Sequence, residues 1–453
     1  MNKMIVLKFG GTSVGSSENI KKVVEIITAC KTQKIVVLSA VSGTTNSLLA
    51  ISKAIKNKQL KESLELIKRL ENEYLDLISD LFISKQYKNK ALSFLFGKFH
   101  FLRNLSSTDL NLENTIVAQG EILSTNLVSM YLEESNISSS LISALAFMEV
   151  HKNNEPNTSK IKAQLTAILN QNPTEKLWIT QGFICKDNAE EISNLQRGGS
   201  DYTASLIGAA IGAEEIQIWT DIDGMHNNDP RFVENTFSLE EISFDEAAEL
   251  AYFGAKILHP QSLIPAKENN IPVLLKNTFS PFSKGTIIKN KSANSGFTAI
   301  AAKDGITAIK IKSYRMLMAY GFLKKVFEVF ENNKTAIDMI TTSEVAISLT
   351  VDDISYLSEI ISELEPFGKI NVDSDLSIIC VAGDFSQKKE GISALVFNAL
   401  KNIPVRMISY GGSDYNISLL VKTTDKIAAL NLLNNELFKE KYLLSEAIGT
   451  FEC

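Results

Sequence analysis

The N-terminal part of the chain repeats one pattern: a short apolar run, a loop of small and hydroxyl residues, and an amphipathic segment. Four segments open on such a run: Met4–Ser17, Lys34–Ile51, Leu177–Cys185 and Ile216–Arg231. Short apolar runs rich in β-branched residues are typical of strands buried on both faces. Their alternation with helical segments, such as Leu195–Ala213, predicts an α/β fold with an open, mainly parallel sheet and helices on both faces.

Two stretches depart from this alternation. Residues 52–112 are charged, have a helical period and contain a single glycine, Gly97, so they predict an α-helical excursion of packed and solvated faces. Residues Asn277–Gly305 are rich in glycine and polar residues and contain Pro281. They predict a strand-bearing margin and then a linker, with a domain boundary near residue 300.

The C-terminal part contains an internal repeat, whose copies begin at Gly321 and Gly391. Each copy reads as a glycine, an amphipathic helix, a polar break, a strand containing Met-Ile, a loop and an alternating strand. The period changes from 3.6 to 2 in both copies. The repeat predicts two βαββαβ modules, at roughly 305–385 and 386–453 or interleaved, whose sheets can pair within a chain or between chains.

Composition excludes several classes of protein. The 453 residues carry a formal net charge of −6, which favours neither nucleic acid nor an anionic membrane as a partner. No apolar stretch approaches the roughly 18 residues of a membrane span. The first strand pattern starts too early for a signal peptide, and the widely spaced Cys30, Cys185, Cys380 and Cys453 suit reduced thiols in a cytoplasmic protein. With four histidines, no metal site is predicted.

The first loop contains candidate phosphate-binding chemistry. Lys8 ends the first apolar run, Gly10 and Gly11 free the backbone, and Ser16 or Ser17 can cap a helix from about Glu18. A lysine, bare amides and a helix N-terminus suit an anion, although a Gly turn with a solvated lysine fits equally. The loop matches neither a P-loop nor the dinucleotide-binding glycine pattern.

Four further constellations converge on one cleft if their loops leave the same sheet edge. They are Ser39 with Thr45 and Asn46, Glu121, the Arg197–Asp201 stretch, and Trp219–Gly224 with Asp229–Arg231 and Phe253–Pro260. The planar fork of Arg197 suits a carboxylate or a phosphate.

Plain structural interpretations of these residues stay open. Asp201 and Glu121 fit first-turn helix positions, and Lys256 fits an exposed helix lysine whose stem covers apolar surface. His259, which precedes Pro260, is predicted to be structural rather than catalytic.

Taken together and in this order, the motifs resemble the aspartate kinases of the amino-acid kinase family. The matching motifs cover nearly the whole chain; they are KFGGTSV (8–14), QGE (119–121), ITQGFI (179–184), RGGSDYTA (197–204), WTDIDG (219–224), DPR (229–231), FGAKILHP (253–260) and TTSE (341–344). The resemblance implies an amino-acid kinase fold followed by two ACT modules, which bind amino acids. It implies a catalytic domain at 1–300, with a substrate part and a nucleotide part at roughly 200–300, and a regulatory region at 301–453.

The resemblance also implies a reaction, ATP-dependent phosphorylation of the side-chain carboxylate of L-aspartate to 4-phospho-L-aspartate, the entry to lysine, threonine and methionine synthesis. The implied catalytic residues are Lys8, Gly10, Gly11 and Asp201. The implied substrate-binding residues are Ser39, Thr45, Glu121, Arg197 and Ser200. The implied ATP-binding residues are Trp219, Thr220, Asp221, Arg231 and Lys256, with Mg²⁺ held through the phosphates.

For regulation, the resemblance implies an effector site at Met318, Ala319, Gly321 and Asp338, with lysine as first choice of effector and threonine as second. Lysine-inhibited relatives often have polar residues in the turn that here reads Met316–Gly321, and Ala336 stands where serine is common. A less polar effector pocket follows. Paired modules further imply a homodimer or a higher homo-oligomer.

Two alternatives remain. One is a kinase of the same fold for another acid, such as glutamate or N-acetylglutamate, against which the helical excursion and duplicated tail argue. The other is a catalytically inactive amino-acid sensor, against which Lys8, Glu121, Arg197 and Asp201 argue.

Overall fold

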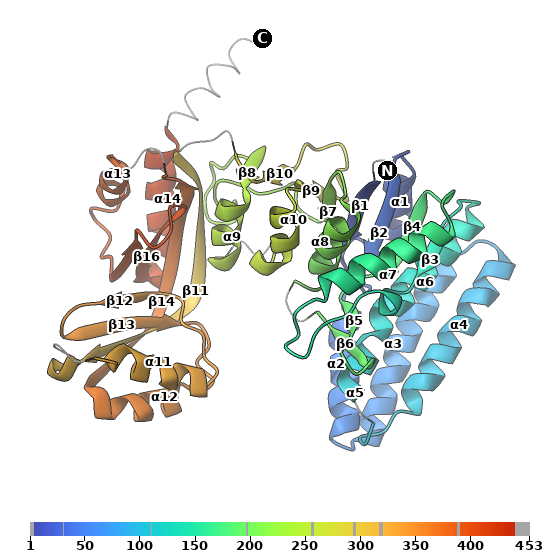
Figure 1. Ribbon diagram of the computed structural model, residues 1–453, viewed down its shortest axis with the longest axis horizontal. Helices are drawn as coiled ribbons and strands as arrows, with labels where there is room; N and C mark the ends of the chain where they lie inside the picture. The colour runs from blue at the N-terminus through green and yellow to red at the C-terminus, as the bar shows by residue number, and fades with distance from the viewer. Residues whose placement is uncertain are drawn as a thin grey trace, which may run out of the picture. The chain divides into compact units, whose positions relative to one another are not determined.

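The computed structural model describes residues 4–29, 31–109, 111–195, 198–254, 258–292, 296–316, 320–386 and 390–439 (Figure 1). The chain divides into two compact units, each described by itself. The first contains Met1–Met225, Glu240–Phe244 and Leu258–Lys291, and the second contains His226–Leu239, Asp245–Ile257 and Ser292–Cys453. Among the described residues, no helix has the length and apolar character that crossing a bilayer requires.

The first unit is built on an eight-stranded sheet in the order β3-β4-β2-β1-β7-β9-β10-β8. The strands are β1 Met4–Phe9, β2 Gln33–Leu38, β3 Ser140–Ile142, β4 Leu177–Gln181, β7 Ile216–Thr220, β8 Glu241–Ser243, β9 Val273–Asn277 and β10 Thr286–Lys289. All neighbours pair in parallel except β9 and β10. The predicted α/β class with a mainly parallel sheet is therefore confirmed.

Helices cover both faces of this sheet (Figure 1). They are α1 Ser17–Ala29, α2 Thr44–Lys56, α6 Gln119–Glu134, α7 Thr158–Gln171, α8 Gly199–Ile211 and α10 Ile264–Glu268. The Ser16 hydroxyl accepts the N–H of Asn19 at 3.2 Å, which confirms the predicted cap of the first helix. The predicted excursion is also helical and consists of α3 Leu60–Leu81, α4 Lys85–Arg103 and α5 Leu112–Val117.

Side chains along β1 alternate between the two faces of the sheet, so only every second residue packs against the helices of the excursion. Ile5, Leu7 and Phe9 are buried in the large core cluster that also contains residues of α1 to α6. Because successive side chains of a strand point to opposite faces, Val6 and Lys8 point the other way. That face of β1 packs against α8, so Lys8 approaches the helix that contains Asp201.

The strand expected over 177–185 is shorter than predicted. It ends at Gln181, and Phe183 takes a left-handed conformation with φ 65°. The chain then turns into a hairpin of β5 Ile184–Lys186 and β6 Ile192–Asn194. The apolar run continues through this turn, which is why the sequence pattern did not reveal it.

The second unit is built on a six-stranded antiparallel sheet in the order β12-β13-β11-β14-β16-β15. The strands are β11 Gly296–Lys312, β12 Ile340–Thr342, β13 Ala346–Val351, β14 Lys369–Asp384, β15 Met407–Tyr410 and β16 Asn416–Lys422. The helices are α9 Phe244–Tyr252, whose residues from Asp245 onward belong to this unit, α11 Phe322–Asn332, α12 Leu357–Leu364, α13 Ile392–Ala399 and α14 Lys426–Leu437.

The two predicted βαββαβ modules are present, and they are interleaved. The second half of β11, with Ile309 and Ile311, packs in one core cluster with α11 and α12. The first half, with Ile300, packs in another cluster that contains Ile379 of β14 and residues of α13 and α14. The two long strands β11 and β14 therefore run through both modules.

The linker expected near residue 300 is a strand instead. Residue 300 lies inside β11, which is bulged between Lys303 and Ile306 and has Gly305 at φ 76°. A bulge interrupts the period-2 alternation of a strand, so the sequence pattern resembled a loop.

Candidate active site

Lys8 and Asp201 form an ion pair at the carboxyl edge of the first sheet. The Lys8 Nζ lies 2.6 Å from Asp201 Oδ1, and the two side chains are only 11% and 16% exposed. The lysine comes from β1 and the aspartate from the first turn of α8. The pair fixes a positive charge on a side chain whose stem is held by the sheet.

The two glycines after β1 have different roles. The Gly10 N–H donates to the carbonyl of Trp219 at 3.2 Å, so it extends the sheet, and the catalytic role implied for Gly10 stays a prediction. The Gly11 N–H makes no hydrogen bond with the described residues. A Cβ on Gly11 would lie 2.9 Å from the Ala40 carbonyl oxygen, so glycine permits the close approach of these two loops.

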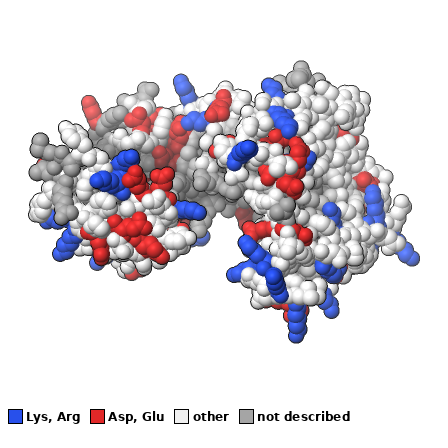
Figure 2. Space-filling model, turned by 60° about the horizontal axis from the view of Figure 1, so that its bottom comes forward, with Lys and Arg blue, Asp and Glu red and all other residues white. Residues whose placement is uncertain are grey.

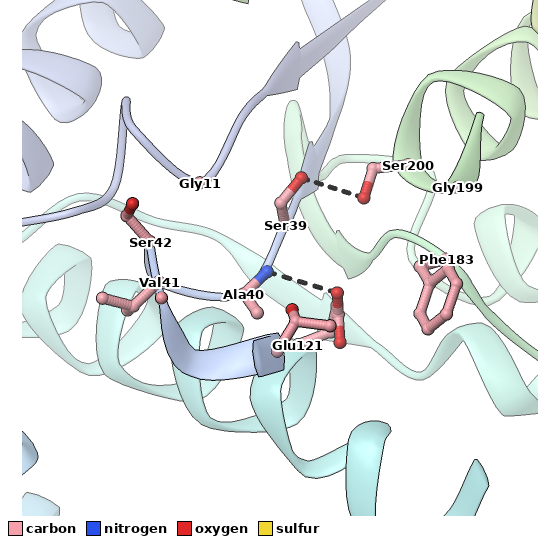
Figure 3. A pocket seen from close by; sticks show the side chains of 11 residues that line it. Gly11, Ser39, Ala40, Val41, Ser42, Glu121, Phe183, Gly199 and Ser200 are labelled. Atoms are coloured by element: carbon pink, nitrogen blue, oxygen red, sulfur yellow. Dashed lines mark hydrogen bonds between the residues drawn. The ribbon is translucent and has the colours of Figure 1, made fainter. Parts of the chain in front are cut away.

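A cavity of about 280 Å³ lies beside these loops (Figure 3). Its lining residues are Gly11, Ser39, Ala40, Val41, Ser42, Gly43, Thr45, Glu121, Phe183, Gly199 and Ser200. The Ser39 hydroxyl donates to the Ser200 hydroxyl at 2.9 Å, across the cavity wall (Figure 3). The structure therefore brings together four of the five predicted substrate-binding residues.

Two helices begin at this cavity. Gly43 precedes α2 and Gly198 precedes α8, and both glycines have a positive φ, of 83° and 72°. In the described part of the chain, no side chain caps either N-terminus. Uncapped N-termini present N–H groups and a partial positive charge, which suits the two carboxylates of a dicarboxylic acid.

Glu121 supplies the negative charge of the cavity. It is 4% exposed, and its Oε1 accepts the Ala40 N–H at 3.3 Å (Figure 3). Its Oε2 is buried and has no hydrogen-bond partner among the described residues. Burial raises the pKa of Glu121 to about 7. A buried carboxylate of this kind can accept a ligand cation such as an ammonium group.

Hydroxyl groups hold the loop between Ser39 and Thr45 in place. The Ser124 hydroxyl of α6 donates to the Ser39 carbonyl at 2.7 Å. The hydroxyls of Thr44 and Tyr74 are 3.0 Å apart, which connects the start of α2 to α3 of the helical excursion. Burial raises the pKa of Tyr74, so its hydroxyl stays protonated. The excursion therefore supports the cavity as well as packing against the sheet.

Three predicted ATP-binding residues, Trp219, Thr220 and Asp221, lie at the carboxyl end of β7 in the first unit. The Trp219 ring is 5% exposed and stacks on Phe9 with 5.8 Å between ring centroids, so its side chain belongs to the core. The Thr220 hydroxyl donates to Asp221 at 3.0 Å, and Asp221 is exposed. The Trp219 ring is therefore not available to a nucleotide, whereas its backbone and the side chains of Thr220 and Asp221 are.

Arg231 lies in the second unit and forms a forked ion pair with Asp229. The distances are 3.0 Å from Arg231 Nε to Oδ1 and 2.6 Å from Nη2 to Oδ2. The guanidinium holds the pKa of Asp229 below its usual range. Arg197 and Lys256, the other two predicted cations, lie outside the described residues.

Of the predicted effector residues, Asp338 is the most informative. Its side chain is 2% exposed, and Oδ1 accepts from Lys303 Nζ at 2.8 Å and from the Tyr252 hydroxyl at 3.0 Å. Its Oδ2 is buried and has no hydrogen-bond partner among the described residues. Gly321 precedes α11 with φ 77°. Met318 and Ala319 lie outside the described residues.

The sequence did not single out Phe183 or the Ala40–Gly43 loop as parts of the cavity. Phe183 has a left-handed backbone, which is rare for a bulky residue and clusters at functional sites. The only signal in the sequence was its place after Gly182 in the ITQGFI motif. The His259 Nδ1 accepts the N–H of Gln261 at 3.2 Å, a contact that supports the predicted structural role.

Acidic and basic side chains both occur on each unit in the face drawn in Figure 2. Within the described ranges, no group of three or more His, Cys, Asp or Glu residues is placed to hold a metal ion.

Gly182 gives a first test of the cavity. A Cβ at this position would lie 2.9 Å from the Cα of Ser200 and would also collide with its side chain. We expect Gly182→Ala to displace Ser200, to raise the KM for the cavity's substrate by roughly tenfold, and to cost about 1–3 kcal/mol of stability. Steady-state kinetics and thermal unfolding measure both effects. Gly97→Ala, where nothing lies within 4 Å of an added Cβ, is the matched control.

The chain is similar to known proteins in both sequence and structure. A family model described as "Amino acid kinase family" matches residues 3–277, and one described as "ACT domain" matches residues 379–437. The lysine-sensitive aspartokinase 3 of Escherichia coli strain K12 is 32% identical over 457 residues, which cover 97% of this chain and 100% of the relative.

Solved structures show the same likeness. The chain is similar to E. coli aspartokinase III in complex with aspartate and ADP (R-state), with a TM-score of 0.81 and 31% identity over 96% of this chain and 100% of the other. It is also similar to the E. coli aspartokinase III complex with lysine and aspartate (T-state), with a TM-score of 0.82 and 32% identity over 96% and 99% of the two chains.

Proposed function

The chain belongs to the amino acid kinase family, and from this premise we propose that it is an aspartate kinase, which transfers the γ-phosphoryl group of ATP to the side-chain carboxylate of L-aspartate. The product would be 4-phospho-L-aspartate, the precursor of lysine, threonine and methionine. Relatives named aspartokinase, and one solved with aspartate and ADP, support the activity.

The distribution of charge around the cavity supports the choice of substrate. The cavity combines two uncapped helix N-termini with one buried carboxylate oxygen that lacks a partner among the described residues. An amino dicarboxylic acid has the complementary charges, two anionic groups and one cation. A cavity of about 280 Å³ suits a ligand of this size, and its position beside Gly11 and Ser200 supports a substrate site near the Lys8–Asp201 pair.

The phosphoryl group would be stabilised by charge rather than by covalent chemistry. Lys8 would face the equatorial oxygens of the transferring group, where negative charge spreads in the transition state. Asp201 would hold the Lys8 ammonium in place, and the Gly11 N–H would donate to the same group. The attacking oxygen belongs to a carboxylate that is already ionised, so no general base is required.

The other substrate contacts follow the charges of the cavity. Glu121 would accept the α-ammonium of aspartate, and Arg197 would hold a carboxylate through its two parallel N–H groups. The hydroxyls of Ser39, Thr45 and Ser200 would surround the substrate.

Thr220, Asp221, Arg231 and Lys256, with the backbone of Trp219, would bind the nucleotide. Mg²⁺ would enter with ATP and neutralise its phosphates, because Mg²⁺ usually keeps several waters and few protein ligands in such sites. The predicted domain division at residue 300 and the cytoplasmic location stay predictions.

Aspartate-dependent ATP turnover is the direct test. Turnover is expected with L-aspartate and not with glutamate or N-acetylglutamate, because the added methylene of glutamate changes the spacing of its two carboxylates in a cavity of about 280 Å³, and N-acetylglutamate also lacks the ammonium that Glu121 would accept. Turnover with glutamate alone would point to the other kinase of this fold. Absence of turnover together with amino-acid binding would point to the inactive sensor.

Regulation is the second part of the proposal. We propose that an amino acid binds near Asp338 at an interface between modules of two subunits and inhibits the kinase, with lysine as first choice and threonine as second. A relative is named lysine-sensitive and has been solved with lysine. Edge strands of paired modules would complete a continuous sheet, which favours a homodimer or a higher homo-oligomer.

Asp338 gives the test of this site. The free Oδ2 would accept the effector's ammonium, so Asp338→Ala is expected to weaken effector binding at least about tenfold, or 1.4 kcal/mol. Inhibition, expressed relative to each variant's own rate without effector, should be lost. The control is Asp352→Ala, which removes the other carboxylate on Lys303, 2.8 Å from its Nζ, and leaves Asp338 in place. Equal inhibition in both variants would exclude this pocket.

A further inference from the structure

The segment that contains Arg231 belongs to the kinase part of the sequence but packs with the C-terminal module. Residues 226–239 lie within the 3–277 match to the kinase family, between β7 and β8 of the first sheet. By packing they belong to the second unit, where they contact α14, the last helix of the described chain.

Asn434 of α14 holds both ends of this segment. Its side chain is fully buried. Its Oδ1 accepts from the side chain of Asn227 at 2.9 Å and from that of Asn228 at 3.4 Å. Its Nδ2 donates to the carbonyl of Asn235 at 2.8 Å. One side chain therefore fixes two points of the segment, on either side of Arg231.

Two further side chains of α14 contact the residue next to Arg231. Asn431 Nδ2 donates to the carbonyl of Phe232 at 3.2 Å. The Lys426 ammonium lies 4.1 Å from the centroid of the Phe232 ring. Together with the Arg231–Asp229 ion pair, these contacts fix the position of the Arg231 backbone and so the position of its guanidinium group.

Packing alone does not account for this arrangement. Asn227, Asn228 and Asn434 are each at most 1% exposed, and burying amide groups costs free energy that an apolar contact would avoid. Paired amide groups fix one geometry, whereas apolar contacts tolerate sliding. Such precision is what a ligand-binding side chain requires, since a shift of about 1 Å can cost about 10² in rate.

We propose that α14 is a positioning element for nucleotide binding, with Asn434 and Asn431 as the positioning residues that act through Arg231. This inference rests on the proposed function, in which Arg231 contacts the nucleotide. It means that α14, the last described helix of the proposed amino-acid-binding region, contributes to ATP affinity, so the kinase part of the sequence does not bind ATP at full strength without it.

The test compares three variants of the full chain, Asn434→Ala, Asn431→Ala and Asn435→Ala. Asn435 is the matched control, because it is the next residue of the same helix and is exposed. Titration calorimetry with ADP is expected to show a Kd increase of at least about fivefold for Asn434→Ala, which loses three hydrogen bonds to the segment, and about threefold for Asn431→Ala, which loses one. Asn435→Ala should bind ADP as the unaltered chain does.

Steady-state kinetics separate positioning from general damage. The KM for ATP should rise with the Kd for ADP, while the KM for aspartate changes less than about twofold. Thermal unfolding reports whether Asn434→Ala folds. If Asn434→Ala does not fold, Asn431→Ala still tests the inference, because Asn431 is partly exposed and its replacement disturbs the core less. Unchanged ADP affinity in the folded variants, or a parallel rise in both KM values, would overturn the inference.

Arg231→Ala distinguishes failure of this inference from failure of the proposed function. If Arg231→Ala weakens ADP binding and the asparagine variants do not, the positioning role alone is wrong. If Arg231→Ala leaves ADP binding unchanged, the assignment of Arg231 to the nucleotide is wrong, and the positioning role falls with it.

Discussion

Lys8→Ala is expected to lower turnover by about 10²–10³, with the KM for aspartate changed less than about threefold. The reason is that Lys8 acts on charge that develops only in the transition state, so its loss affects kcat rather than ground-state binding. Lys8 is held ready by its 2.6 Å pair with Asp201 and by the strand from which it projects. The measurement is aspartate-dependent ADP formation at saturating ATP and aspartate.

Lys8→Ala also leaves Asp201 without its cation in a mostly buried place, so stability must be measured beside activity. Lys8→Arg keeps the charge and tests position, and it is expected to recover only part of the rate because the guanidinium is planar and larger. Lys31→Ala, an exposed lysine between α1 and β2, is the control and should retain full turnover. Near-normal turnover in a folded Lys8→Ala enzyme would exclude Lys8 from the reaction.

The residues at the strand ends could be predicted because their signals are local. Lys8 and Ser39 lie at the ends of β1 and β2, and parallel strands end at one edge, so these two residues could be expected to meet there, together with the glycine loop that leads to Ser200 in α8. The two hydroxyls do meet, at 2.9 Å. Ser16 as a helix cap follows from the same kind of short-range pattern.

Other features depend on contacts between distant residues, which no local pattern reports. The sequence does not show whether the Trp219 ring lines the site or lies in the core. Its stacking on Phe9 shows that it lies in the core. Asn434 and Asn227 are far apart in sequence and look like surface residues, yet they meet in a buried network. The bulge in β11 likewise hid a strand that both modules share.

Glu121→Gln is expected to raise the KM for aspartate by about 10² and to leave ADP affinity unchanged within about twofold. A hydrogen-bonded ion pair between the aspartate ammonium and the Glu121 carboxylate is replaced by a neutral contact, at a cost of about 2–3 kcal/mol. Glutamine keeps the size of the side chain and can still accept the Ala40 N–H. Glu133→Gln, an exposed glutamate of the same helix paired with Lys90, is the control.

The pH dependence gives an independent measure of the same role. Since burial raises the pKa of Glu121 to about 7, the free enzyme carries the required negative charge above that pH and loses it below. We expect kcat/KM for aspartate to fall about tenfold per pH unit below pH 7, because this ratio reports ionisations of the free enzyme. In Glu121→Gln this fall should disappear. A fall that persists in the variant would assign the titration to another group.

Stability distinguishes a carboxylate kept for binding from one kept for structure. The pKa of Glu121 is about 7 in the folded state and 4.5 in the unfolded state. The charged form of Glu121 therefore lowers the free energy of unfolding. This loss is absent at low pH, grows from about pH 4.5 and is complete above pH 7. The full cost is about 3 kcal/mol. Glu121→Gln should therefore be more stable than the unaltered chain at pH 8, by up to that amount, and about equal to it at pH 4. Denaturant unfolding at the two pH values measures the difference. If the glutamine variant is instead less stable at pH 8, Glu121 is a structural residue, and the ammonium of the substrate must be held by a different group.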